Sequence, residues 1–273
     1  MILFCDLDGV VWLAHQPIAG SVAGLNRWQA KGHEVVFVTN NSFSRLAEQE
    51  GFLEEIGIAA RGRVVSSATA VGSLVSSGEN VLVVGGPGIE EAVLARGAKV
   101  ITPDTFRHDA AERRLNDLDI AEVVDAVIVG FDRRFDYERL TIANSAVRAG
   151  ARLIGTNHDP TYPTPDGPIP GGGSLVAAVG YASETKPIFA GKPNRPMFEV
   201  ALDRASIISG RPIAKSEIVV IGDRLDSDGA FAEQAGVRFC HVRTGVNSLG
   251  AENVASYENL DEVISSLLLE HGG

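Results

Sequence analysis

The sequence predicts an α/β fold in which one α/β domain is inserted into another. Short apolar runs rich in strand-forming residues alternate with segments that carry helix start and stop signals. This alternation is typical of a parallel sheet whose strands are joined by right-handed helical crossovers. The alternation is interrupted at residues 76–80, a Ser/Gly/Asn stretch suited to a hinge, and the chain returns to the first domain near residue 186. We therefore expect a first domain of residues 1–78 and 187–273 and an inserted domain of residues 79–186.

The individual elements follow from apolar runs and from the glycines and polar residues that bound them. Expected strands cover residues 2–5, 34–38, 64–66, 80–84, 99–101, 126–130, 152–155, 185–190, 217–221 and 238–242. Expected helices cover residues 21–31, 45–56, 68–76, 89–95, 136–149, 174–182, 196–205, 229–235 and 260–269. Gly32, Gly57 and Gly150 follow three of these helices as stop signals. A proline-rich loop connects residues 156 and 173.

Composition narrows the class of protein. The net charge of −11, without a basic run, argues against nucleic acid or an anionic membrane as partner. An anionic substrate would therefore need local help from a metal ion, a lysine or backbone amides. Cys5 and Cys240 both lie in apolar runs and are expected to be buried hydrophobic residues. No apolar run reaches the roughly 20 residues of a membrane span, and no signal peptide is apparent, so we expect a soluble cytoplasmic protein.

Two aspartates follow the first expected strand at a spacing of two residues. Asp6 and Asp8 come directly after residues 2–5, and Gly9 ends the strand. Side chains two residues apart on an extended chain point to the same side, so both carboxylates should emerge where open α/β sheets bind ligands. Carboxylates this close repel each other unless a cation or a shared proton lies between them. Mg²⁺ fits because it prefers oxygen ligands; the alternative is a solvated turn.

Three further strand ends carry polar residues suited to binding phosphate and metal ions. They are Thr39-Asn40-Asn41 after residues 34–38, Lys192 after residues 185–190, and Asp223 with Asp228 after residues 217–221. The carboxyl ends of parallel strands share one edge of the sheet, so these residues can converge with Asp6 and Asp8. Two of the segments have a structural alternative, because Thr-Asn-Asn also caps helices and Gly-Lys-Pro also forms surface turns.

Phosphoryl transfer would give the catalytic roles to three of these residues. Its transition state spreads negative charge over the phosphoryl oxygens, so positioning and electrostatics dominate catalysis. Asp6 can attack phosphorus and form an aspartyl-phosphate. Asp8 can protonate the leaving alkoxide and later deprotonate the attacking water. Lys192 can offset the repulsion between Asp6 and the phosphate.

The remaining residues would bind the phosphate and the metal ion. The residues expected to contact the substrate phosphate are Thr39, Asn40, Asn41 and Lys192. The expected Mg²⁺ ligands are Asp6, Asp8 and Asp223, with Asp228 supporting them without touching the ion.

These motifs, in this order, resemble those of the haloacid dehalogenase superfamily over nearly the whole chain. The four family motifs are matched by residues 6–10 (Asp-Leu-Asp-Gly-Val), by Thr39-Asn40, by Lys192 in Gly-Lys-Pro, and by Gly222-Asp223 through Asp228. The second aspartate of the first motif implies a phosphatase. About 30 residues separate the first two motifs and about 150 separate the second from the third. This spacing implies subfamily IIA, the NagD-type and 4-nitrophenyl phosphatases, with a Rossmann-like parallel-sheet core and an inserted α/β cap of the C2 type.

The resemblance also implies contacts from the cap. Residues 9–12, 156–159, 170–175 and 223–225 look like further signatures of the group. Asn157, His158 and Asp159 are expected to contact the leaving group, together with the glycine-rich turn at residues 171–174; for His158 the alternative is a loop histidine with no role. The group also suggests a homodimer formed through the cap. The implied substrate is a small phosphorylated metabolite, such as a sugar phosphate, glycerol phosphate, nucleotide or pyridoxal phosphate.

Two alternatives to a phosphatase stay open at this point. One is a phosphotransferase or phosphomutase, in which an alcohol replaces water as the acceptor. The other is a catalytically silent protein that binds phosphorylated metabolites. A dinucleotide site at residues 85–88 is rejected, because Glu91 stands at the third glycine position of the fingerprint and Pro87 lacks an amide N–H.

Overall fold

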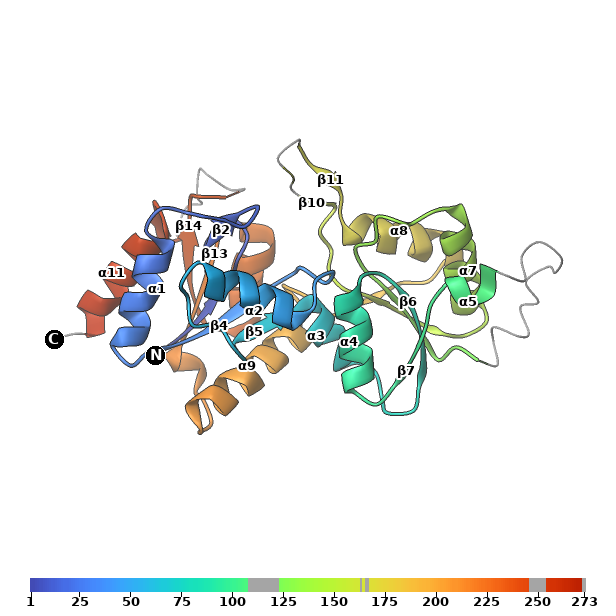
Figure 1. The fold of residues 1–273 in the computed structure, drawn as a ribbon, viewed down its shortest axis with the longest axis horizontal. Coiled ribbons are helices and arrows are strands. Elements are labelled where there is room, and N and C mark those ends of the chain that lie inside the picture. Colours follow the sequence, from blue (N-terminus) through green and yellow to red (C-terminus); the bar gives the residue numbers. More distant parts are fainter. Residues whose placement is uncertain (108–122, 163, 165–166, 246–253, 272–273) are drawn as a thin grey trace. The chain divides into compact units, whose positions relative to one another are not determined.

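The computed structural model describes residues 1–107, 123–162, 164, 167–245 and 254–271, and the chain divides into two compact α/β units (Figure 1). Unit 1 comprises residues 1–39, 46–65 and 192–273, and unit 2 comprises residues 40–45 and 66–191. From the sequence we expected the inserted domain to cover residues 79–186. Unit 2 instead includes α3 (Ser67–Gly72), mainly because this helix packs against α4 (Pro87–Ala95). The two helices approach so closely that a Cβ on Gly72 would lie 3.2 Å from the carbonyl oxygen of Ala92.

In the described part of unit 1, six strands form a sheet in the order β15-β14-β13-β1-β4-β5. The strands are β1 (Ile2–Cys5), β4 (Glu34–Thr39), β5 (Val64–Ser66), β13 (Ile218–Gly222), β14 (Arg238–Val242) and β15 (Ser256–Tyr257). β1 pairs in parallel with both β4 and β13, and Cys5 lies opposite Phe37 on one side and Ile221 on the other. The strand that precedes Asp6 is therefore flanked by the strands that carry Thr39 and Asp223.

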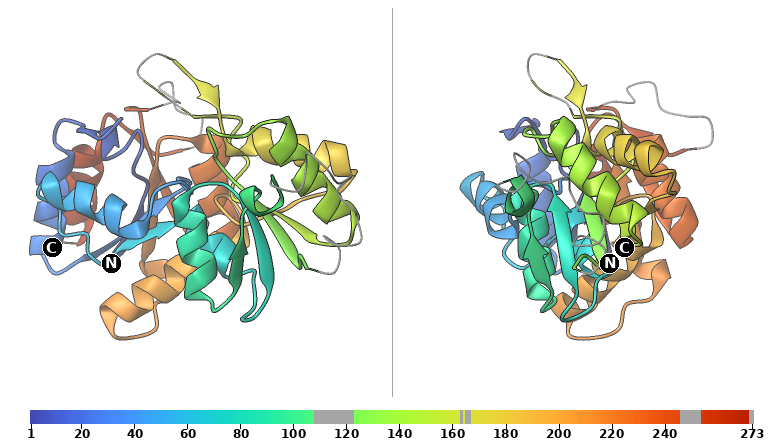
Figure 2. Two further views of the ribbon diagram at one scale, coloured as in Figure 1. Left: turned by 45° about the vertical axis from the view of Figure 1, so that its right-hand side comes forward. Right: turned by 90° about the vertical axis from the view of Figure 1, so that its right-hand side faces the viewer.

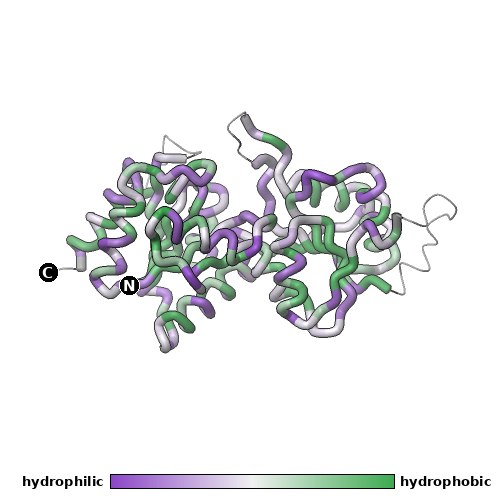
Figure 3. Tube along the Cα trace, in the orientation of Figure 1, coloured by the Kyte–Doolittle hydropathy of each residue, from purple (hydrophilic) through white to green (hydrophobic). Residues whose placement is uncertain are grey.

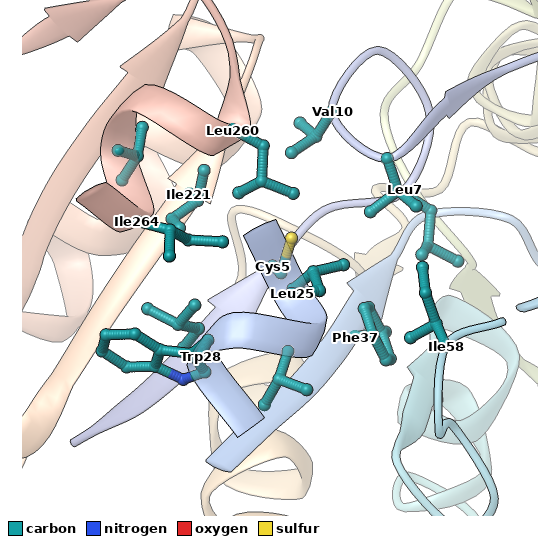
Figure 4. Packing of buried hydrophobic residues seen from close by; sticks show 14 of the residues in the cluster. Cys5, Leu7, Val10, Leu25, Trp28, Phe37, Ile58, Ile221, Leu260 and Ile264 are labelled. Atoms are coloured by element: carbon teal, nitrogen blue, oxygen red, sulfur yellow. The ribbon is translucent and has the colours of Figure 1, made fainter. Parts of the chain in front are cut away.

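Helices cover both faces of this sheet, which explains why its central strands are continuous apolar runs. The helices of unit 1 are α1 (Ser21–Ala30), α2 (Leu46–Glu55), α9 (Arg195–Ser209), α10 (Ala230–Ala235) and α11 (Leu260–His271). On one face Cys5, Phe37 and Ile221 share a core with Leu25 and Trp28 of α1 and with residues of α11 (Figure 4). On the other face the centroid of the Phe198 ring lies 5.8 Å from the ring centroids of both Phe4 and Phe231. Cys5 and Cys240 are buried free thiols, as predicted.

The described part of unit 2 is built on a five-stranded parallel sheet in the order β12-β9-β8-β6-β7. Its strands are β6 (Asn80–Val84), β7 (Lys99–Ile101), β8 (Ala126–Val129), β9 (Arg152–Gly155) and β12 (Ile188–Phe189). Helices α7 (Tyr137–Arg148) and α8 (Gly172–Ser183) cover one face, and α4 lies on the other (Figure 2). Hydrophobic residues run along the strands of each sheet (Figure 3). α5 (Asp104–Arg107) follows β7.

Several short elements were not predicted from the sequence. They are the hairpin β2 (Trp12–Leu13) and β3 (Gln16–Pro17), the hairpin β10 (Thr161–Tyr162) and β11 (Ile169–Pro170), the 3₁₀ turn Lys215–Glu217, the π-helical turn Leu225–Gly229, and the short elements α5 and β15. The predicted helix 68–76 ends early, at Gly72, and the predicted strand 185–190 is reduced to Ile188–Phe189. Within the described residues, no helix combines the length and the apolar character needed to cross a membrane.

Candidate active site

The polar residues of unit 1 gather where β1, β4 and β13 end. Asp6 directly follows β1, Thr39 is the last residue of β4, and Asp223 directly follows β13. Because the three strands are parallel and in register, their carboxyl ends lie at one edge of the sheet. The Asp6 backbone N–H continues the ladder by donating to the carbonyl of Ile221 at 2.9 Å. Thr39 is buried at this edge, with 2% of its surface exposed.

Lys192 connects two of the carboxylates. Its Nζ lies 2.8 Å from Oδ1 of Asp6 and 2.7 Å from Oδ1 of Asp228, and its side chain is only 3% exposed. Burial by itself favours the neutral amine, but the carboxylates of Asp228 and Asp6 outweigh it and raise the pKa of Lys192 above its usual value. Lys192 is therefore a fixed positive charge that cannot easily be lost.

The carboxylates of Asp6, Asp223 and Asp228 form one buried group. One oxygen from each lies within 4.8 Å of the others. Burial raises the pKa of Asp6 well above its usual value; Lys192 opposes the rise, whereas Asp228 and Asp223 add to it. Three acidic groups facing one lysine leave an excess of negative charge that a divalent cation would balance, and carboxylate oxygens are the ligands that Mg²⁺ prefers. The donor set thus fits a hard divalent ion.

Glycines make this close approach possible, among them Gly9 and Gly222 of the sequence motifs. Gly9 has a left-handed backbone with φ of +83°, and a Cβ there would lie 2.7 Å from Cγ of Asp223. A Cβ on Gly222 would lie 2.2 Å from Cβ of Asp228. The Asp-x-Asp-Gly and Gly-Asp sequences are therefore required sterically, since a side chain at either position would push a carboxylate out of the group.

Asp228 lies nearer the centre of the group than the sequence suggested. The π-helical turn Leu225–Gly229 buries it completely, and its Oδ2 accepts a hydrogen bond from the backbone N–H of Arg224 at 3.2 Å. Its Oδ1 is the oxygen that contacts Lys192. From the sequence we expected Asp228 to support the metal ligands without touching the ion. In the structure it is instead one of the three carboxylates that could hold a cation.

Asp8 lies outside this group of three. Its carboxylate is half-buried, and Oδ1 accepts a hydrogen bond from the indole N–H of Trp12 at 3.1 Å. Burial raises the pKa of Asp8, and the Trp12 hydrogen bond and the nearby His15 partly oppose the rise. A raised pKa suits a group that must hold and release a proton. A metal-ligand role for Asp8 stays a prediction.

The residues expected to contact the leaving group belong to unit 2, as do Asn40 and Asn41. Several of these residues are joined by hydrogen bonds. Nδ2 of Asn40 donates to Oδ2 of Asp159 at 3.1 Å, and Nδ2 of Asn157 donates to the carbonyl of Asn40 at 2.8 Å. Oδ1 of Asn41 accepts from the backbone N–H of Phe43 at 2.9 Å, as a turn-forming asparagine does. These contacts order the segments 40–43 and 157–159.

His158 is exposed, and its ring stacks on Phe189 with 3.5 Å between ring centroids. This contact gives the ring a packing role within unit 2. Whether His158 also contacts a leaving group stays a prediction.

Two residues that contact the site were not singled out from the sequence. Trp12 was noted only as part of a family signature, although its spacing of four residues from Asp8 gives a hint. His241 is fully buried at the end of β14, and its Nε2–H donates to the carbonyl of Asp223 at 3.2 Å, while Nδ1 lies 3.2 Å from Oγ of Ser256. A histidine inside the apolar run 238–242 was the available signal for this support of Asp223.

Comparisons with protein families agree with the position of these motifs. Residues 3–99 match the model of the haloacid dehalogenase-like hydrolases, and residues 189–268 match a second model described as HAD-hydrolase-like. The two matched stretches include Asp6, Asp8, Thr39, Lys192 and Asp223.

Several proteins named as phosphatases are similar to nearly the whole chain. An acid sugar phosphatase from Staphylococcus aureus is 32% identical over 272 residues, covering 96% of each chain. A 4-nitrophenylphosphatase from Thermotoga maritima superposes with a TM-score of 0.81 at 26% identity, covering 97% of this chain and 96% of that one. A glycerol phosphate phosphatase from Mycobacterium tuberculosis, solved in complex with magnesium, gives a TM-score of 0.77 at 31% identity, covering 96% of this chain and 76% of that one.

Proposed function

This chain belongs to the haloacid dehalogenase-like hydrolases, and we propose that it is a Mg²⁺-dependent phosphatase that hydrolyses small phosphate monoesters through an aspartyl-phosphate on Asp6. The observation that carries the proposal is the buried group in which Lys192 contacts Asp6 and Asp228 while Asp223 lies beside them. This group combines a nucleophile, a fixed positive charge and oxygen ligands. The three named relatives support a phosphatase reaction.

In the first half-reaction a carboxylate oxygen of Asp6 forms a bond to phosphorus while the bond from phosphorus to the ester oxygen breaks. Asp8 gives its proton to the ester oxygen, so the alcohol leaves as a neutral molecule. Lys192, 2.8 Å from Asp6, reduces the repulsion between the carboxylate and the incoming phosphate. The product is an aspartyl-phosphate on Asp6.

In the second half-reaction the ionised Asp8 takes a proton from a water molecule. The water oxygen forms a bond to phosphorus, and the bond between phosphorus and Asp6 breaks. Inorganic phosphate leaves, and the carboxylate of Asp6 is restored. The same residue thus serves as acid and then as base, which its raised pKa favours.

In this proposal the remaining polar residues of unit 1 hold the Mg²⁺ ion and the substrate phosphate. Mg²⁺, when bound, supplies positive charge against the negative charge that develops on the phosphoryl oxygens. Asp6, Asp223 and Asp228 would hold it. The metal-ligand role predicted for Asp8 is not part of this mechanism, because Asp8 holds and releases the proton. Thr39, at the end of β4, binds phosphate oxygens together with the backbone amides that follow it.

Unit 2 selects the substrate in this proposal. Asn157, His158 and Asp159 contact the leaving group, whereas Asn40 and Asn41 contact the substrate phosphate. The substrate is a sugar phosphate or glycerol phosphate, as the names of the relatives suggest. Nucleotides and pyridoxal phosphate complete the set of candidates. Homodimerisation through unit 2 is a further prediction, which light scattering on the purified protein checks.

The test is hydrolysis of 4-nitrophenyl phosphate and of a panel of phosphorylated metabolites, with and without Mg²⁺. Release of inorganic phosphate that depends on Mg²⁺ and is lost in Asp6→Asn supports the proposal. Absence of hydrolysis of every ester would instead favour a catalytically silent binding protein. Adding sugars or glycerol as acceptors distinguishes a phosphotransferase, which would form new phosphate esters in place of inorganic phosphate.

A further inference from the structure

The chain turns sharply after Asp6 and brings Trp12 back beside Asp8. A single carbonyl, that of Leu7, accepts from the backbone N–H groups of Val10, Val11 and Trp12 at 3.2, 2.9 and 3.2 Å. The turn is closed by Gly9, whose N–H donates to the carbonyl of Trp12 at 2.8 Å. The backbone thus fixes the distance between residues 8 and 12 independently of their side chains.

The side chains of these two residues are joined by a hydrogen bond. The indole N–H of Trp12 donates to Oδ1 of Asp8 at 3.1 Å, and Trp12 is only 2% exposed. A buried indole N–H needs an acceptor, and a hydrogen bond to a carboxylate is stronger than one between neutral groups. The contact therefore restricts the rotation of the Asp8 carboxylate.

Trp12 is itself held by a hairpin with an unusual turn. Ala14 and His15 connect β2 and β3 with φ values of 47° and 62°, a left-handed conformation that normally favours glycine or asparagine. The centroid of the His15 ring lies 5.2 Å from that of Trp12 and 4.4 Å from that of Phe52. Such turns persist where the surrounding structure fixes them, and here His15 makes tilted ring contacts with both Trp12 and Phe52.

We propose that Trp12 is a positioning residue for the acid–base step: its indole N–H holds Oδ1 of Asp8, so that the other oxygen, Oδ2, carries the proton that is exchanged. This inference rests on the role of Asp8 in the proposed function. The Oδ2–H bond breaks as the leaving oxygen gains its proton, and Oδ2 later takes a proton from water. Without Trp12 the carboxylate would rotate between orientations, and only some of them would place the proton correctly.

The test compares two esters that differ in how much they need an acid. The 4-nitrophenolate ion leaves readily without a proton, whereas glycerol leaves poorly unless it is protonated. In Trp12→Phe, which keeps an aromatic ring and removes the N–H, kcat/KM for glycerol phosphate should fall at least about tenfold more than kcat/KM for 4-nitrophenyl phosphate. An equal fall for both esters, or no fall, would overturn the proposal.

Trp28→Phe is the matched control. Trp28 is also buried in unit 1, and its indole N–H donates to the carbonyl of Glu34 at 2.9 Å. Removing this donor should not change the ratio of kcat/KM for the two esters. A change in the ratio as large as that in Trp12→Phe would mean that any lost indole hydrogen bond produces the effect, and would overturn the specific role of Trp12.

A second measurement does not depend on activity. The chain has two tryptophans, so ¹⁵N-labelled protein gives two indole N–H signals, which Trp28→Phe assigns. Asp8→Ala should shift the Trp12 signal and leave the Trp28 signal in place. A Trp12 signal that does not move would overturn the contact even in an active enzyme. If the wild-type protein hydrolyses no ester, the proposed function fails, and this shift still decides whether Trp12 holds Asp8.

Discussion

The ammonium group of Lys192 lies 2.7 Å from Oδ1 of Asp228, and both side chains are almost completely buried. Asp6 approaches the same ammonium at 2.8 Å, so one buried cation serves two buried carboxylates. A charge in such a place is costly unless it is paired, and each member of the group depends on the others.

Lys192→Met should therefore destabilise the protein strongly. Breaking a buried ion pair by removing one partner costs about 3–5 kcal/mol, and here the loss leaves three buried carboxylates without a cation. Mg²⁺ should restore part of this stability, and by more than it stabilises the wild-type protein. Urea denaturation with and without Mg²⁺ measures both effects. Lys186→Met, at an exposed lysine, is the control and should change the midpoint little.

Asp6→Asn should abolish turnover and preserve the fold. The amide cannot form the phosphoenzyme, so hydrolysis of 4-nitrophenyl phosphate should fall by at least about 10³-fold, as for other catalytic nucleophiles. Lys192 keeps Asp228 as its partner, so the thermal unfolding midpoint should remain near that of the wild type. Substantial remaining activity, in protein whose substitution is verified by mass spectrometry, would exclude Asp6 as the nucleophile.

Gly9→Ala should weaken Mg²⁺ binding by more than its loss of folding stability alone would explain. The new Cβ would meet the Asp223 carboxyl at 2.7 Å, in addition to the cost of a left-handed residue, which is about 1–2 kcal/mol. Gly32→Ala is the matched control, because Gly32 has a φ of +78° and nothing within 4 Å of a Cβ. Both variants should lose similar backbone stability. Gly9→Ala alone should lose at least about tenfold in Mg²⁺ affinity, equivalent to roughly 1.4 kcal/mol; equal affinities would show that Asp223 can move aside.

Binding of Mg²⁺ should release protons and weaken as the pH falls. Burial raises the pKa of Asp6, so the metal-free protein keeps this carboxyl protonated at pH values where an exposed aspartate is ionised. A cation binds the ionised form and must displace that proton, so its affinity drops below the raised pKa and levels off above it. Titration calorimetry in two buffers with different ionisation heats measures the protons released. The observed heat should depend on the buffer in the wild type and much less in Asp6→Asn.

The general position of the site could be predicted from the sequence because it follows from the order of strands. Apolar runs that end in Asp6, Thr39 and Asp223 are recognisable locally, and parallel pairing then places their ends at one edge. In the structure Asp6, Lys192, Asp223 and Asp228 lie together. The roles assigned to them remain proposals.

The two local features that could not be predicted from the sequence depend on unusual backbone conformations. Ala14 and His15 lack the glycine or asparagine that signals a tight hairpin, so the hairpin that supports Trp12 was not predicted. A π-helical turn of five residues is too short to show a period, so residues 225–229 were not expected to turn Asp228 toward Lys192. In both cases tertiary packing decides a conformation that local propensity does not favour.

The sheet order of unit 1 also bears on how the protein is made. β1, which leads to Asp6, is completed on one side by β13, so that Ile2 lies opposite Ile218. A ribosome must therefore synthesise unit 2 and α9 before the strand that delivers Asp223 can join the sheet. Until translation has passed that strand, the nascent chain therefore lacks Asp223 and Asp228, and Asp6 cannot join them in the buried group of carboxylates.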